Sequence, residues 1–129
     1  MKTKLLNISK QLLIVKTPEE LNILLNELIE TLNLSWTDYQ KGIDTFSAFE
    51  LNALENELNR YDSAEQIIVY IFYSSITTLN EYSFKQKNDP FNAENKVMIY
   101  ASIYILKSIV KWLDVNFNVK DFNIYYEIS

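Results

Sequence analysis

Apolar residues recur every three or four positions after Pro18, which is the pattern of one buried face of an α-helix. Thr17 can cap the first free amides of this helix, Pro18 suits its first position, and Glu20 completes a capping box. The spacing therefore predicts an amphipathic helix over residues 17–32. Its apolar positions are Leu21, Leu24, Leu25, Leu28, Ile29 and Leu32.

Four apolar residues before the first proline are also three or four positions apart, and they predict an N-terminal helix that ends near Lys16. The residue before a proline is pushed out of helical geometry, so this helix stops before Pro18. The run 12–15 would also suit a short strand, and we favour the helix. The spaced residues are Leu5, Ile8, Leu12 and Val15.

Three segments in the middle of the chain begin with helix-start signals. Ser35 and Asp38 with Gly42 behind them bracket a short helix, while residues 47–50 and 63–66 are capping boxes. The run 67–73 is rich in β-branched and aromatic residues, which favours a strand on propensity alone. Its apolar pattern continues at helical spacing as far as residue 82, and this length favours a helix.

The pair Asp89-Pro90 predicts the start of the last long helix, and the polar residues 85–88 before it are expected to form a linker. Beyond Asp114 the apolar period changes from that of a helix to that of a strand, so residues 115–128 fit a hairpin, an extended arm or a helix. The expected contact face of the long helix is Val97, Ala101, Ile105, Ile109 and Trp112, with Met98, Leu106 and Leu113 beside it.

Together these patterns predict an all-α fold. We expect one domain over residues 1–129, a bundle of four or five helices, with 114–129 as a tail that is either helical or a short extended or hairpin segment. The chain has 129 residues, the size of one domain. It contains a single glycine, and some of its 14 asparagines can occupy turn positions that need a positive φ.

Composition excludes most catalytic chemistry. The chain has no cysteine and no histidine, so thiol nucleophiles, zinc fingers and imidazole bases are ruled out, and one glycine is too few for a phosphate-binding loop. Glu20 and Glu27 share a helix face, as do Glu50 and Glu57, but both pairs lie outside the apolar stripes. We expect no enzyme activity, no cofactor and no metal site.

The longest apolar run is too short to span a bilayer, and the basic N-terminus lacks the apolar stretch of a signal peptide. These features predict a cytoplasmic protein that does not bind membranes. The net charge of −5 and a single arginine disfavour nucleic acid as a partner, because affinity for it comes mainly from basic residues.

Charge is unevenly distributed along the chain. Residues 1–16 carry four lysines and no acid, residues 17–65 carry eleven acids against two basic residues, and the remainder is balanced. If the helices of 17–65 are neighbours, their polar faces form one negative field, which would attract a basic partner. A surface that serves only solubility is the other interpretation.

In size, charge and lack of reactive groups the chain resembles bacterial immunity or antitoxin-type proteins, which cover the basic clefts of toxin nucleases. The resemblance implies a non-enzymatic inhibitor that neutralises a basic protein partner. A self-associating structural or adaptor protein of phage or mobile-element origin is the alternative. The expected partner-binding residues are Glu19, Glu20, Glu27, Glu30, Trp36, Asp38, Tyr39, Asp44, Glu50 and Glu57.

Overall fold

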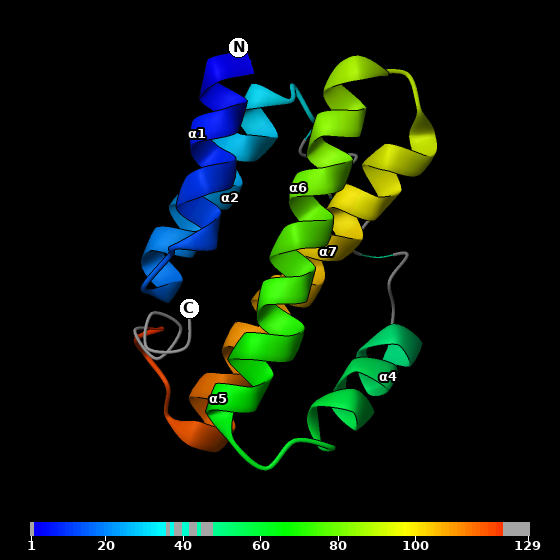
Figure 1. Cartoon of the computed structure of the whole chain (residues 1–129). Coiled ribbons are helices and arrows are strands. Elements are labelled where there is room, and N and C mark those ends of the chain that lie inside the picture. The colour runs from blue at the N-terminus through cyan, green and yellow to red at the C-terminus, as the bar shows by residue number, and fades with distance from the viewer. Residues whose placement is uncertain (1, 36, 38–39, 42–43, 45–47, 123–129) are drawn as a thin grey trace.

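Helices make up every regular element that the computed structural model describes, which covers residues 2–35, 37, 40–41, 44 and 48–122 (Figure 1). The predicted all-α bundle is confirmed. In chain order the elements are α1 (Lys2–Leu13), α2 (Pro18–Thr31), α4 (Ala48–Leu58), α5 (Ala64–Ile67), the π-helical segment η1 (Ile68–Phe72), α6 (Tyr73–Asn88) and α7 (Ala93–Phe117).

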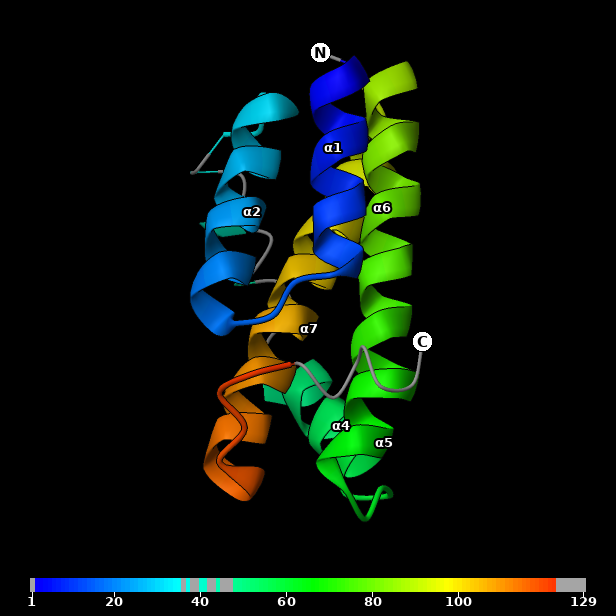
Figure 2. The ribbon, with the colours of Figure 1, turned by 60° about the vertical axis from the view of Figure 1, so that its left-hand side comes forward.

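The elements pack as a series of neighbours. α1 and α2 form an antiparallel pair, α1 also packs on α6, and α6 packs along α7 (Figures 1 and 2). α4 lies against α7 at the other end of this series. One apolar core connects all of them, with leucine and isoleucine side chains from α1, α2, α6 and α7 at its centre.

The start of α2 matches the prediction. The Thr17 hydroxyl oxygen accepts the Glu20 N–H at 3.2 Å, and the Glu20 carboxylate accepts the N–H of Lys16 at 3.1 Å. Five of the six predicted apolar residues are buried and Leu32 is half-buried. The N-terminal helix is also confirmed, but it ends at Leu13 and not near Lys16. Three of its spaced apolar residues are buried within it, and Val15 is buried just after its end.

Asn33 ends α2 in the left-handed region, with φ of 55°. Its N–H donates to Glu30 O and the N–H of Leu34 donates to Ile29 O, both at 3.0 Å, so the last carbonyls of the helix are satisfied. Asn118 ends α7 in the same way, with φ of 54°. At both helix ends asparagine occupies the left-handed position that glycine usually takes in such caps. The abundance of asparagine in the sequence indicated this role.

Residues 64–88 form one continuous helix, and the strand alternative for 67–73 is wrong. Ser63 caps this helix by accepting the Gln66 N–H at 3.2 Å, and a π-helical turn follows within it. The helix runs through the polar stretch 85–88, which was expected to be a linker. Asp89-Pro90 lies in the loop before α7, because Asn92 provides the cap by accepting the Asn95 N–H at 3.1 Å.

The buried face of α7 is rotated from the predicted one. Val97 was expected to face the core but is 44% exposed, whereas Ile99 and Ile103, which were not predicted, are fully buried. Ala101 and Ile109 are buried as predicted. The rotation follows from the packing of α7 on both α6 and α4, since the side chains that these helices cover cannot be inferred from α7 alone.

α7 continues to Phe117, so the part of the predicted hairpin at 115–117 is helical. After Asn118 the chain turns back along the bundle, and Phe122 enters the core. Its N–H donates to the carbonyl of Lys16. Residues 118–122 therefore form a short irregular arm, and the rest of the predicted tail lies outside the described residues.

Candidate functional site

Four acidic residues of α2 lie on its solvent side. Glu19 and Glu20 lie four and three positions before the exposed Ile23, and Glu27 and Glu30 lie four and seven positions after it. All of them therefore share one face of the helix. Ile23 is 58% exposed at the centre of this face. We call Glu19, Glu20, Ile23, Glu27 and Glu30 the α2 acidic face.

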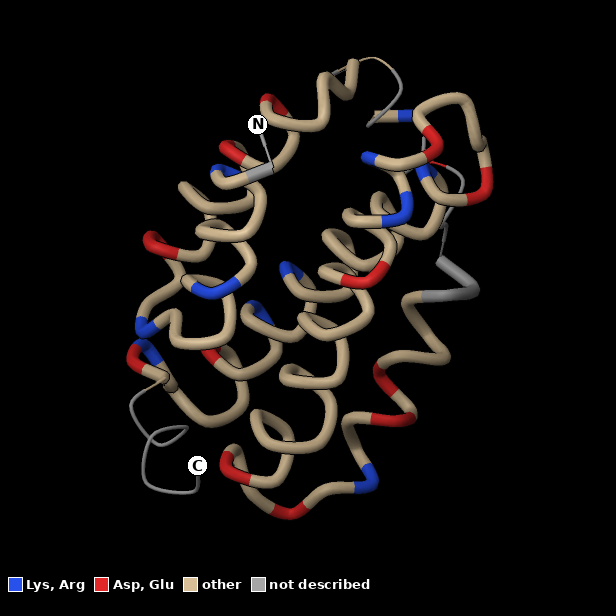
Figure 3. Tube along the Cα trace, turned by 45° about the horizontal axis from the view of Figure 1, so that its top comes forward, with Lys and Arg blue, Asp and Glu red and all other residues tan. Residues whose placement is uncertain are grey.

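The carboxylates of this face are available for contact. Glu19, Glu27 and Glu30 form no ion pair with any lysine or arginine among the residues that the structure describes. Glu20 differs from these three residues, because its carboxylate accepts a hydrogen bond from the N–H of Lys16. Basic positions are interspersed with the acidic ones on the α1–α2 side of the molecule (Figure 3).

The predicted acidic side chains that the structure describes do not come together on one surface. α2 and α4 lie on different sides of the bundle with α7 between them, so the single negative field that would require neighbouring helices is not formed (Figures 1 and 3). Glu57 of α4 instead pairs with Arg60 at 3.0 Å.

The remaining predicted residues fall outside the α2 acidic face. Asp44 is exposed and accepts a hydrogen bond from the Gln40 amide at 3.3 Å. For Glu50 the structure describes the backbone in α4 but not the side chain. Trp36, Asp38 and Tyr39 lie outside the described residues.

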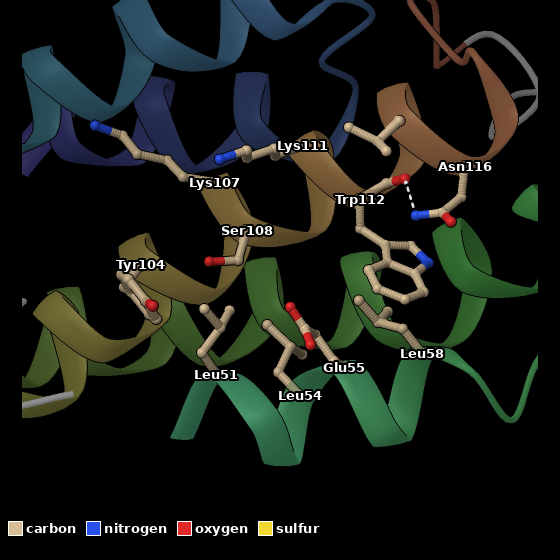
Figure 4. Close-up of a pocket in the computed structure, with 11 residues that line it drawn as sticks. Leu51, Leu54, Glu55, Leu58, Tyr104, Lys107, Ser108, Lys111, Trp112 and Asn116 are labelled. Atoms are coloured by element: carbon tan, nitrogen blue, oxygen red, sulfur yellow. Dashed lines mark hydrogen bonds between the residues drawn. The ribbon is translucent and has the colours of Figure 1, made fainter. Parts of the chain in front are cut away.

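A groove of about 610 Å³ separates α4 from α7 (Figure 4). Leucines of α4 form one wall, and Trp112 and Val115 of α7 form part of the other. Val115 is 73% exposed, although it continues an apolar helix face. The lining residues are Leu51, Leu54, Glu55, Leu58, Tyr104, Lys107, Ser108, Lys111, Trp112, Val115 and Asn116.

Glu55 is the acidic residue of this lining, and its half-buried carboxylate lies among the leucines and Trp112 (Figure 4). It forms no ion pair with a described residue. The sequence shows Glu55 only as one of eleven acids in residues 17–65. Nothing in its spacing distinguishes it, because the groove is created by two helices, α4 and α7, that are separated along the chain by α5, η1 and α6.

Among the described residues no group of three or more acidic side chains is placed to hold a metal ion. Within the same residues, none of the helices has the length and apolarity needed to cross a bilayer. Comparisons of the chain with protein-family models, with curated proteins and with solved structures find no match. The indications of function therefore come from the α2 acidic face and from the groove between α4 and α7.

Proposed function

We propose that this chain is a non-enzymatic binding protein that docks on a basic protein partner through the α2 acidic face. The feature that supports the proposal is an exposed Ile23 surrounded by carboxylates on one rigid helix. An apolar centre with a polar rim is the usual arrangement of a protein–protein interface. No bond is made or broken in this role.

The kind of partner follows from the charge. Lysine and arginine side chains that bind phosphate would meet Glu27 and Glu30, while an apolar residue beside them would cover Ile23. We propose a toxin nuclease as that partner, with the chain acting as its immunity-type inhibitor in the cytoplasm of a bacterium. Opposite charges would steer the two proteins together and raise the association rate at low salt.

The test begins with affinity purification of the tagged chain from its source cells, followed by identification of the bound protein. Association rates are then measured for the double variant Glu27→Lys and Glu30→Lys, which leaves the capping residues of α2 unchanged. The double variant Asp62→Lys and Glu65→Lys makes the same change in net charge at exposed positions around the start of α5, away from α2, and serves as the control.

The proposal predicts slower association for the α2 variant than for the control, with a difference that shrinks as salt is raised. Equal rates for both variants would show that net charge alone matters and would remove the α2 acidic face as the docking site. Capture of an acidic partner would contradict the proposal as a whole.

Self-association is the second candidate, and exposed tyrosines favour it. Tyr70 is 61% exposed and stacks on Tyr61 with ring centroids 6.1 Å apart, and Tyr73 is exposed beside it. Tyrosine is enriched at protein interfaces. Sedimentation velocity distinguishes the candidates: a stable oligomer that dissociates on Tyr70→Ser supports self-association, and a monomer supports the inhibitor.

A further inference from the structure

We propose that the groove between α4 and α7 binds a small organic cation, an amine that carries an apolar body. This site is separate from the α2 acidic face and does not depend on the function proposed for that face. Its volume of about 610 Å³ lies within the range of roughly 300–1,000 Å³ that is usual for small-molecule sites.

The walls of the groove are suited to an apolar body. Leu51 and Leu54 are only half-buried, because α4 stands away from α7 where they project. Trp112 faces them from α7 and Leu58 forms the buried end. A ligand that fills this space would remove the leucine side chains from water, and this burial of apolar surface favours binding.

The charge inside the groove is negative. The carboxylate of Glu55 lies between the leucines and the indole of Trp112, and no described basic side chain pairs with it (Figure 4). A carboxylate at an apolar wall binds most strongly to a cation that also donates a hydrogen bond to it. An amine supplies both interactions.

Two lysines also belong to the lining, but their amines lie on the other side of α7. In Figure 4 the side chains of Lys107 and Lys111 extend away from α4. Both residues also line a second hollow, together with Pro18 and Glu19 at the start of α2. The positive charges of both lysines are therefore directed toward α2. The charge inside the groove is that of the Glu55 carboxylate.

Aromatic rings strengthen the preference for a cation. Trp112 and Tyr104 line the groove on either side of Ser108. The face of an aromatic ring attracts an ammonium group, and tryptophan does so best. A cation held by Glu55 beside Trp112 would combine the two attractions.

The test uses three probes with one apolar body and different head groups: phenylbutylamine, phenylbutanol and phenylbutyrate. Binding to the whole chain is measured by calorimetry and by the emission of Trp112 in a Trp36→Phe background. The proposal predicts that the amine binds about tenfold more tightly than the alcohol, with the acid weakest. This comparison needs no change at the groove, so it does not depend on how a groove variant folds.

The variant Glu55→Gln keeps the shape of the side chain and removes its charge. It should abolish the preference for the amine over the alcohol, while Glu57→Gln, on the same helix and outside the lining, should keep it. Equal affinity for the three probes, tighter binding of the acid, or binding of none of them would each overturn the proposal. Binding of an apolar lysine-containing peptide without binding of the amine would also overturn it, in favour of a protein partner.

Discussion

The ring of Phe122 packs against the ring of Phe72, with the centroids 5.0 Å apart and the planes at 43°. Phe122 comes from the irregular arm after α7, and Phe72 ends the π-helical segment of the long central helix. The N–H of Phe122 also donates to the carbonyl of Lys16, in the connection between α1 and α2. One residue near the C-terminus thus joins three distant parts of the chain.

Phe122→Ala should therefore destabilise the fold strongly. Both rings are almost completely buried, and truncation of a buried phenylalanine costs about 3–5 kcal/mol because a cavity remains. Phe91→Ala is the control, since Phe91 is 94% exposed and its loss should cost no more than about 0.5 kcal/mol. The free energy of unfolding from urea titrations measures both. Similar small values for the two variants would show that the arm is not part of the core.

The cap of α2 leads to a second prediction. The Thr17 hydroxyl accepts the Glu20 N–H, so Thr17→Ala should lower the free energy of unfolding by about 1 kcal/mol. Thr77→Ala removes a hydroxyl that bonds only to the carbonyl of Tyr73 within α6, and alanine suits a helix interior better. Thr77→Ala should therefore leave stability unchanged or raise it. A larger loss at Thr77 than at Thr17 would contradict the assigned cap.

The left-handed conformation of Asn33 leads to a third. An alanine at φ of 55° suffers a contact between its Cβ and the backbone that costs about 1–2 kcal/mol, whereas glycine has no Cβ. Asn33→Ala should lower the melting temperature and Asn33→Gly should maintain it, as measured by circular dichroism. If both variants have the same melting temperature, the turn after α2 does not require a positive φ.

Local signals in the sequence were enough to predict α1, α2 and the long helix from 64, because each has an apolar stripe at helical spacing and the last two also have a cap at Thr17 and Ser63. These signals failed to locate the two ends of α7. Asp89-Pro90 resembles a helix start, yet Asn92 makes the cap three residues later. Residues 115–117 alternate like a strand, yet they continue α7, whose helical hydrogen bonds extend to Asn118.

Candidate sites were harder to predict than helices, because they depend on which faces meet. The acidic residues of α2 were identified by their spacing, and the structure places them on one face. A field shared with α4 was expected only if the two helices were neighbours, and this condition is not met, because α7 lies between them. The role proposed for Glu55 could not be foreseen for the same reason: its surroundings come from α7.

The ion pair between Lys85 and Glu81 leads to a last prediction, on pH. The Glu81 carboxylate, 3.2 Å from Lys85 Nζ, accepts its hydrogen bond and raises the pKa of Lys85 above its ordinary value of 10.5. Glu81→Gln should therefore lower that pKa, which an NMR titration of the lysine side chain would show. A pKa raised by folding adds stability below the unfolded pKa and loses it as the pH rises through the folded pKa. The small advantage of the native chain over Glu81→Gln in melting temperature should thus be present at pH 9 and vanish above the pKa of Lys85. An advantage that persists unchanged after the lysine has lost its proton would assign the effect to something other than this ion pair.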